Sequence, residues 1–327
     1  MTAMLHRALL FLYAETPVHP GADTGLGALD LPIQREVTTG LPIIKGESLK
    51  GALREHLRPP VISEAAWKKM FGAAPPRSGI PGGAMTPGEL RVHEAQIVAF
   101  PAPALDGFSW VTSPLARARL DRRARLAGIT SLPGDTLPGG EDSDPEEADD
   151  DTRCLMTNTS SRGRKNPRPE PVVLGSYAFT AAGNNGLKDW AVAVAEAALP
   201  GLAEHEYFRD RLKRETYQVS DVAMRAITSE CTVVAARVQL GADDEHGIPV
   251  KTVKHGPFYS EYLPGETLLA ALIESASADH LDALAEQISD QVIQVGGDET
   301  IGKGLMWCRI VRSSAREAAP AANEAGR

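Results

Sequence analysis

The stretch TGLPIIKGESLKGALR, from Thr39 to Arg54, joins a short apolar run to the start of a helix. The run ends at Lys45-Gly46, and Ser48 is a typical N-cap residue, so we expect the helix to begin there. A helix N-terminus presents unpaired N–H groups, and a glycine leaves room for a phosphate to approach them. The stretch predicts an anion-binding helix start that uses Lys45, Gly46, Ser48, Lys50 and Arg54. The alternative is a capped amphipathic helix whose basic face is solvated.

The charge of the chain is unevenly distributed, which bears on whether it can bind a polyanion. The 327 residues carry a net charge of −9, whereas phosphate binding depends on Lys and Arg. Nine of the 43 acidic residues lie between Asp135 and Asp151, a range without any base, and the other 34 acids are matched by 34 bases. The rest of the chain is therefore neutral, and nucleic acid is not excluded as a partner.

Composition also indicates a cellular context. A hydrophobic content of 43% allows a substantial core, and the sequence has neither a window of 18 apolar residues nor a signal-peptide pattern. We therefore expect a soluble, cytoplasmic protein with no membrane partner. Cys154, Cys231 and Cys308 are far apart and odd in number, which predicts three reduced thiols and neither a disulfide framework nor a zinc site.

Apolar periodicity predicts strands that alternate with helices. This pattern fits an α+β fold with a ferredoxin-like sheet, of the kind found in RNA-recognition motifs. We expect strands at 5–14, 89–100, 172–179, 267–273 and 305–311, helices at 48–57, 63–71, 113–127, 187–199, 204–215, 220–229 and 279–293, and a β-hairpin formed by 232–240 and 248–259.

The middle of the chain differs in composition from its two ends. We expect residues 1–112 and 219–327 to form the ferredoxin-like domain and residues 113–218 to form an insertion. Within the insertion, residues 128–170 are poor in apolar residues and change from acidic to basic, which predicts a mobile loop. The helix at 113–127 is basic, and its arginines form either a solvated face or a contact with RNA or another subunit: Arg117, Arg119, Arg122, Arg123 and Arg125.

A glycine-rich loop, GGDETIGKG at 296–304, lies near the end of the chain. Its first part matches a P-loop, but Gly304 stands where a P-loop has the Ser or Thr that binds Mg²⁺, and a helix is expected before the loop rather than after it. An ATPase is therefore not expected. Gly302, Lys303 and Gly304 suit backbone contact with a sugar-phosphate chain, and a plain structural turn is the alternative.

Several segments occur in a defined order along the chain: TPVHPG at 16–21, GLG at 25–27, DLPIQRE at 30–36, the stretch at 39–54 and the glycine-rich loop. This set resembles the RAMP superfamily of CRISPR-associated proteins, most closely the repeated backbone subunit of type III-B (Cmr) RNA-targeting effector complexes. The resemblance covers about residues 5–60 and 219–312. It implies a ferredoxin-like RAMP palm, with the hairpin at about 231–259 as a thumb that wedges between guide and target strands.

The resemblance also implies partners and a reaction. Copies of the chain would form a helical filament along a CRISPR guide RNA (crRNA), together with a large signalling subunit, a small helical subunit and capping RAMP subunits. Each copy would cut the paired target RNA, with Asp30 as the catalytic carboxylate and the RNA 2′-OH as the nucleophile. Asp30 would bind Mg²⁺ or another divalent cation, or remove a proton.

The resemblance points to two further positions near the site. His19 is expected to contact a phosphate or to assist as an acid, and Tyr262, which follows Glu261, is expected to stack on a base and bind RNA. Plainer roles stay open, namely a turn-capping aspartate at Asp30 and a packed loop histidine at His19. Two other functions also stay open: a metal-independent crRNA-processing RAMP endoribonuclease that relies on His19, and a non-catalytic, crRNA-binding structural subunit.

Overall fold

The computed structural model describes residues 5–22, 29–72, 86–130, 132, 151–157, 170–240 and 253–313. No helix in these ranges is both long enough and apolar enough to span a membrane. The helices are α1 (Gly46–His56), α2 (Glu64–Phe71), α3 (Pro114–Leu126), α4 (Asn185–Ala198), α5 (Glu206–Arg214), α6 (Asp221–Glu230) and α7 (Ala278–Ile288), with 3₁₀ turns η2 (Ala203–His205) and η3 (Glu299–Ile301). The strands are β1 (His6–Ala14), β2 (Ile43–Ile44), β3 (Arg91–Val92), β4 (Ala95–Ala104), β5 (Gly107–Thr112), β6 (Arg153–Met156), β7 (Glu170–Leu174), β8 (Tyr177–Gly183), β9 (Thr216–Gln218), β10 (Val233–Leu240), β11 (Val253–Tyr262), β12 (Leu268–Ser275), β13 (Gln291–Gln294) and β14 (Leu305–Val311).

A large mixed sheet organises the fold, so the predicted α+β class is confirmed. Its strands follow the order β13-β14-β1-β12-β4-β5-β9-β6-β8-β7, with β2 beside β4 and β3 beside β12. Strand β1 lies between β12 and β14 and is antiparallel to both. The sheet continues from β4 through β5 into strands of the predicted insertion, so its two parts share one hydrogen-bonded surface.

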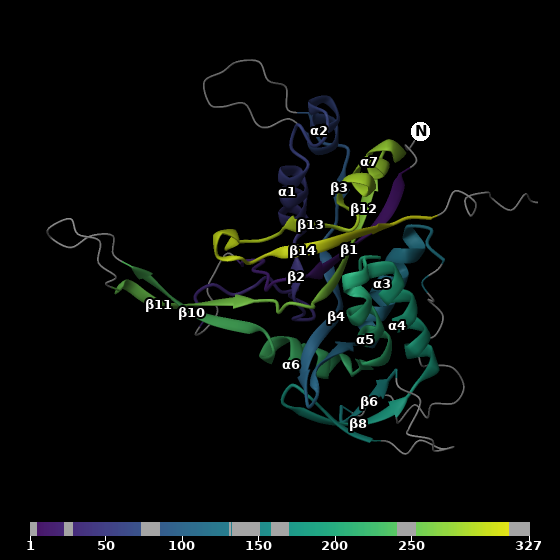
Figure 1. The fold of residues 1–327 in the computed structure, drawn as a ribbon, viewed down its shortest axis with the longest axis vertical. Coiled ribbons are helices and arrows are strands. Elements are labelled where there is room, and N and C mark those ends of the chain that lie inside the picture. The colour runs from purple at the N-terminus through teal and green to yellow at the C-terminus, as the bar shows by residue number, and fades with distance from the viewer. Residues whose placement is uncertain are drawn as a thin grey trace, which may run out of the picture.

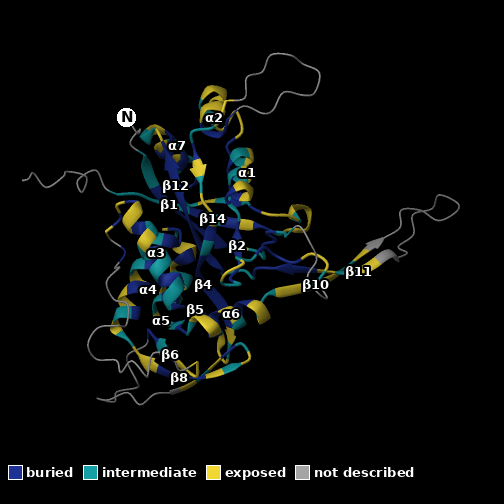
Figure 2. Ribbon diagram, turned by 180° about the vertical axis from the view of Figure 1, so that it is seen from behind, coloured by how far each residue is buried: buried dark blue, intermediate teal, exposed yellow. Residues whose placement is uncertain are grey.

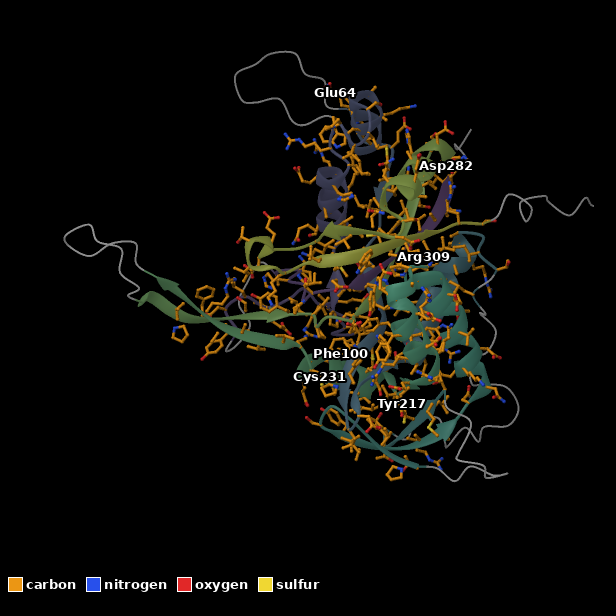
Figure 3. All side chains as sticks on the ribbon, in the orientation of Figure 1. Glu64, Phe100, Tyr217, Cys231, Asp282 and Arg309 are labelled. Atoms are coloured by element: carbon orange, nitrogen blue, oxygen red, sulfur yellow. The ribbon has the colours of Figure 1, made fainter. Side chains whose placement is uncertain are left out.

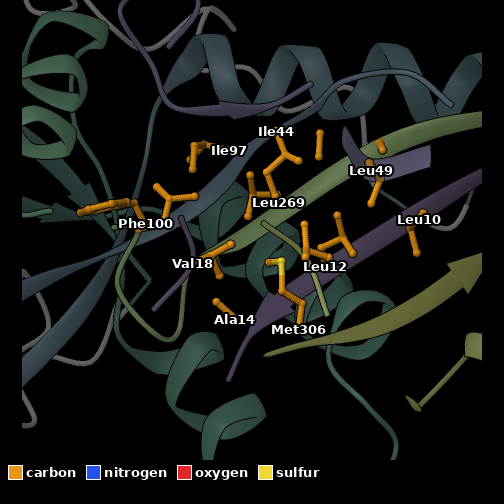
Figure 4. Packing of buried hydrophobic residues seen from close by; sticks show 14 of the residues in the cluster. Leu10, Leu12, Ala14, Val18, Ile44, Leu49, Ile97, Phe100, Leu269 and Met306 are labelled. Carbon is orange, nitrogen blue, oxygen red and sulfur yellow. The ribbon is translucent and has the colours of Figure 1, made fainter. Parts of the chain in front are cut away.

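Strand β1 shows why helices cover both faces of this sheet. Its residues 8–14 are all buried, and alternate side chains enter two different apolar clusters. Leu10 and Leu12 pack with α1 and α7, whereas Leu9 and Phe11 pack with α3 and α4. Figure 4 shows the first cluster around β1, and Figure 1 shows α1 and α7 apart from α3, α4 and α5. A nearly continuous apolar run is expected of a strand that is buried on both faces.

The hairpin of β10 and β11 is separate from the large sheet. The two strands pair with each other in an antiparallel ladder and form a two-stranded sheet of their own. Figure 1 shows this ribbon projecting from the body, and Figure 2 shows exposed residues along it, in contrast with the buried central strands. The predicted hairpin is therefore confirmed, while its turn at 241–252 lies outside the described residues.

Local predictions failed where tertiary contacts decide the boundary. Helix α1 begins at Gly46 with Lys45 at the N-cap position, so the predicted cap at Ser48 is wrong. The predicted strand 172–179 is two strands, β7 and β8, separated by a turn in which Gly175 has a φ of 61°. The predicted helix 279–293 ends at Ile288, and β13 follows it. Strand β6 lies inside 128–170, most of which falls outside the described residues.

The basic helix α3 uses three arginines to attach itself to the rest of the fold. Arg117 is 1% exposed and donates to Gln218 Oε1 at 2.5 Å. Arg119 donates to Glu36 Oε2 at 2.8 Å, and Arg123 donates to the carbonyl oxygen of Ala270 at 2.6 Å. These three side chains therefore do not form a fully solvated face, and the predicted contact with RNA or another subunit stays a prediction.

Candidate functional site

One edge of strand β11 carries both predicted catalytic residues. The side chain of Asp30 accepts a hydrogen bond from the backbone N–H of Tyr259 (2.7 Å), and the ring of His19 bonds to the carbonyl oxygen of Glu261 (2.7 Å). The N–H and C=O groups of residues two apart in a strand point toward the same edge, and such residues are about 7 Å apart. The fold thus holds these two side chains along one line.

Asp30 is exposed, and its loop is fixed by the strand. The N–H groups of Asp30 and Leu31 donate to the carbonyl oxygen of Tyr259, and the N–H of Glu261 donates to the carbonyl oxygen of Leu31. Leu31 forms a parallel bridge with Ser260. Asp30 therefore caps a strand edge rather than its own turn, and no described residue binds Oδ1, which leaves this oxygen for a reacting group or an ion.

His19 is 9% exposed and lies with its ring against that of Tyr262, at a centroid distance of 5.5 Å. A carbonyl oxygen can only accept, so Nδ1 carries the proton that is donated to Glu261, and Nε2 is the nitrogen left for other chemistry. A Cβ atom at Gly21 would lie 2.9 Å from Nε2, so this glycine keeps one side of the nitrogen uncovered. His19 is consequently both a packed loop histidine and a ring with one usable nitrogen.

Glu261 joins the Asp30 loop to the base of the hairpin. Its carboxylate is 3% exposed and forms a 2.6 Å ion pair with Arg35. The same carboxylate accepts hydrogen bonds from the N–H of Ile33 (3.0 Å) and from Thr232 Oγ1 (2.9 Å). Because the carboxylate is nearly fully buried and both of its oxygens accept hydrogen bonds, Glu261 holds the loop in place.

Tyr262, which is predicted to stack on a base, packs inside the protein. It is 1% exposed, and its hydroxyl donates to Asp298 Oδ2 at 2.8 Å. The ammonium of Lys303 lies 5.5 Å from its ring centroid, and His19 packs against the same ring. The ring is therefore covered by protein groups in this structure, and stacking on a base would require Lys303, which is only partly buried, to move aside.

The glycines of the 296–304 loop have different functions. Gly296 and Gly304 have φ values of 83° and 85°, and a Cβ at either position would overlap a backbone carbonyl oxygen, that of His19 or that of Val295. These two glycines are therefore needed for packing. Gly302 has a φ of 74° with nothing within 4 Å of a Cβ position, so its backbone is open to a ligand.

The start of α1 lies next to the Asp30 loop through Gln34. The Gln34 side chain donates to the carbonyl oxygen of Gly21 (2.8 Å) and accepts from the N–H of Lys45 (3.2 Å). The N-cap residue makes no side-chain cap hydrogen bond, and Ser48 is exposed in the first turn. The first turn of α1 therefore has no side-chain cap, and the predicted anion site stays a prediction, at a helix start two residues earlier than expected.

Three residues of the predicted anion site are used inside the protein instead. A Cβ at Gly46 would meet the carbonyl oxygen of Val92, so this glycine serves helix packing and not phosphate approach. Lys50 donates to the carbonyl oxygen of Leu90 at 2.7 Å, and burial, with a smaller contribution from Arg54, lowers the Lys50 pKa. The Arg54 guanidinium lies 4.5 Å from the ring centroid of Trp67. Lys50 and Arg54 thus have partners inside the protein, and their predicted phosphate contacts stay a prediction.

A metal ion at Asp30 would have to share its ligands with the substrate. Within the described ranges, no group of three or more His, Cys, Asp or Glu residues is placed to hold a metal. Asp30 alone offers one free carboxylate oxygen. Mg²⁺ commonly keeps several waters and binds one or two carboxylates together with substrate phosphates, so this donor fits Mg²⁺ that arrives with RNA.

Four residues that organise the site were missed in the sequence: Gln34, Arg35, Arg237 and Asp298. Gln34 and Arg35 lie in the DLPIQRE segment, and Asp298 lies in the glycine-rich loop. The sequence therefore pointed to these segments, but it did not show what each of the three side chains does. Arg237 had no such signal, since its partner Asp298 is far away in the chain.

Comparisons with known proteins identify the family and the fold of the chain. The family model described as the RAMP superfamily matches residues 11–307. A relative described as CRISPR system Cmr endoribonuclease Cmr4, from Pyrococcus furiosus, is 30% identical over 308 residues, which cover 91% of this chain and 93% of the relative. The crystal structure of oligomeric Cmr4 from Pyrococcus furiosus has a TM-score of 0.65 at 25% identity and covers 94% of this chain and 98% of that one. The cryo-EM structure of the type III-B Cmr-beta complex bound to cognate target RNA shares the fold, with a TM-score of 0.62 at 17% identity and coverage of 93% and 96%.

Proposed function

The chain belongs to the RAMP superfamily, and on this premise we propose that it is the backbone subunit of a type III-B CRISPR effector complex. Copies of it line up along a crRNA, and each copy cuts the paired target RNA. The similar Cmr4 of Pyrococcus furiosus is described as an endoribonuclease, and its crystal structure is oligomeric, which supports both an RNA-cleaving activity and self-assembly. Other type III-B subunits complete the complex.

The observation that carries this proposal is the shared edge of β11. Asp30 and His19 come from two separate segments, yet both side chains bind backbone groups of β11 that are two residues apart. Glu261, on the same strand, fixes the loop that follows Asp30. A carboxylate and an imidazole in one fixed geometry are the groups that general acid–base chemistry requires.

The body of the fold corresponds to a palm and the hairpin to a thumb. Strands β14-β1-β12-β4 are consecutive neighbours and antiparallel, α1 connects β1 to β4, and α7 connects β12 to β14. This is the β-α-β-β-α-β order of a ferredoxin-like unit. The hairpin projects beside the Asp30 loop, where it would separate one base pair of the guide–target duplex and splay the adjacent nucleotide.

The RNA backbone would be held by groups that the fold leaves accessible. These are the ammonium groups of Lys45 and Lys303, the first-turn amides of α1, including that of Ser48, and the open backbone at Gly302. Such contacts read the phosphate chain and not the bases, so base pairing with the crRNA supplies the sequence specificity.

The reaction uses the nucleophile that RNA carries itself. The 2′-oxygen attacks the adjacent phosphorus, a 2′-O–P bond forms, and the P–O5′ bond breaks to leave a 2′,3′-cyclic phosphate and a 5′-hydroxyl end. Asp30 Oδ1 accepts the proton of the 2′-OH. Protonated His19 donates from Nε2 to the leaving O5′, while its Nδ1–H stays bonded to Glu261. Positioning of the splayed nucleotide contributes much of the rate.

Instead of accepting the proton, Asp30 Oδ1 would hold a divalent cation such as Mg²⁺ together with phosphate oxygens, and the cation would stabilise negative charge on the phosphate. The protein's own part is to orient Asp30 through the N–H of Tyr259. Metal dependence distinguishes this function from a crRNA-processing enzyme that relies on His19 alone.

The test is target cleavage by the assembled complex with Asp30→Ala. We expect the regularly spaced products to disappear while target binding is unchanged, and EDTA to have the same effect on the wild type. Asp189→Asn, an exposed acid on α4, is the matched control and should cut normally. Unchanged products with Asp30→Ala would remove Asp30 from the reaction. Cutting that persists in EDTA would favour the metal-independent enzyme, and binding without any cutting by the wild type would favour a structural subunit.

A further inference from the structure

The projecting hairpin is held at its base by two ion pairs of opposite polarity. On one side the hairpin supplies the acid, Glu261, and the body supplies Arg35, at 2.6 Å. On the other side the hairpin supplies the base, Arg237, and the glycine-rich loop supplies Asp298, also at 2.6 Å. The β10–β11 ladder consists of backbone hydrogen bonds and needs neither ion pair. Both pairs instead connect the ribbon to the body and so affect its orientation.

Strand register places the two pairs on opposite faces of the ribbon. Arg237 is opposite Phe258 and Val234 is opposite Glu261, and side chains alternate between faces along each strand. Arg237 therefore shares its face with Tyr262, whereas Glu261 lies on the other face. Figure 3 labels Cys231 close to the point where the hairpin leaves the body.

Asp298 connects the hairpin to the turn of the glycine-rich loop. Its two carboxylate oxygens are both used, Oδ1 by Arg237 at 2.6 Å and Oδ2 by the hydroxyl of Tyr262 at 2.8 Å. Its backbone has a φ of 67°, and its carbonyl oxygen accepts from the N–H groups of Ile301 and Lys303. One residue thus fixes both the 3₁₀ turn η3 and one face of the hairpin.

The two pairs differ in exposure, which gives them different functions. The side chains of Glu261 and Arg35 are 3% and 20% exposed, and Glu261 has two further hydrogen bonds, so this pair is a fixed attachment. The side chains of Asp298 and Arg237 are 19% and 28% exposed. Salt screens a partly exposed pair more strongly than a buried one.

We propose that Asp298 and Arg237 are positioning residues that set the tilt of the hairpin toward the glycine-rich loop, and thereby the position at which Asp30 cuts the target. This inference rests on the proposed function, because it assumes that the hairpin separates the duplex beside Asp30. A hairpin released from Asp298 pivots about the Glu261 attachment, and the splayed nucleotide then meets Asp30 in more than one register.

The test combines the position of the cut with the orientation of the hairpin. Asp298→Asn keeps the size of the side chain and removes its charge. Arg237→Ala removes the partner of Asp298, whereas Arg237→Lys keeps a positive charge at that position. We expect the share of product ends outside the main cut position to rise about fivefold with Asp298→Asn or Arg237→Ala, the factor that corresponds to a partly exposed ion pair. Arg237→Lys should recover most of the precision, and the double variant should be no worse than either single one.

Distances between spin labels at Val238→Cys on the hairpin and Asp189→Cys on the body, in a Cys231→Ser background, report the tilt. The distance distribution should broaden with Asp298→Asn, and wild-type protein in high salt should show the same broadening. Glu299→Gln, an exposed acid of the same turn, is the matched control and should change neither readout.

The distance measurement and the cut positions test different parts of the proposal. A distribution as narrow with Asp298→Asn as in the wild type would overturn the tilt, and a broader distribution with unchanged cut positions would overturn the positioning role. A wild-type complex that does not cut at all would contradict the proposed function, and the distances would still decide whether Asp298 holds the hairpin.

Discussion

Two glycines in the same helix give a direct test of how α1 is placed. Gly46 is the first residue of α1 and is buried, whereas Gly51 lies in the middle of the helix and is exposed. A Cβ at Gly46 would lie less than 3.0 Å from the carbonyl oxygen of Val92 and 3.2 Å from the backbone of His93. A Cβ at Gly51 would have nothing within 4 Å. Alanine at these two positions should therefore have opposite effects.

The magnitudes follow from these contacts. At Gly46 the obstacle is backbone, which cannot rotate away as a side chain would, so alanine forces α1 and β3 apart and costs about 1–3 kcal/mol of unfolding free energy. At Gly51 alanine lowers the backbone entropy of the unfolded chain and improves helix propensity, which stabilises by about 0.5–1 kcal/mol. The two variants should thus differ by roughly 1.5–4 kcal/mol.

Urea unfolding followed by circular dichroism measures this difference as a shift of the midpoint. We expect a lower midpoint for Gly46→Ala and a slightly higher one for Gly51→Ala than for the wild type. RNA affinity of the folded variants is measured in parallel. A Gly46→Ala protein that is as stable as the wild type but binds RNA weakly would refute the reasoning, because the space beside Gly46 would then belong to a phosphate.

Two more predictions address charge. Burial raises the pKa of Glu266 to about 7, so the folded state holds a proton that the unfolded state releases near pH 4.5, and stability should fall between about pH 4.5 and 7, by on the order of 3 kcal/mol in total. Glu266→Gln should remove that fall, as melting temperatures at pH 5 and pH 8 will show, and an equal fall in both proteins would contradict the assignment. Lys45→Ala combined with Lys303→Ala should weaken RNA binding and reduce its salt slope by about 1–2, whereas Lys50→Ala with Arg54→Ala should leave the slope unchanged. If only the Lys50→Ala and Arg54→Ala variant reduced the salt slope, the basic face of α1 would be the RNA contact.

Much of the fold could be predicted because its signals are local. The apolar run at 5–14 predicted the strand β1, and Ser220 predicted the start of α6, where its side chain caps the N–H of Ala223. The boundaries that failed depend on distant residues. Helix α1 starts at Gly46 because that residue packs on Val92, and no pattern within 39–54 contains this information.

The candidate site was predicted by segment more accurately than by residue. The segments that carry Asp30, His19 and the glycine-rich loop, which were singled out in the sequence, meet around β11. The role of each polar side chain depended on its partner, and the partners of Glu261 and Asp298 are Arg35 and Arg237, far away in the chain. The accessibility of the Tyr262 ring could not be predicted either, because burial of a side chain depends on residues that are far away in the chain.

The most direct test of the account is a structure of the assembled complex with crRNA and a target that carries a 2′-deoxy nucleotide at the cut site, so that cleavage cannot occur. The account predicts that the carboxylate of Asp30 lies within direct or one-water hydrogen-bond reach of the 2′ position, with Lys45 and Lys303 on backbone phosphates. A structure in which Asp30 faces away from the RNA at every cut site would contradict it.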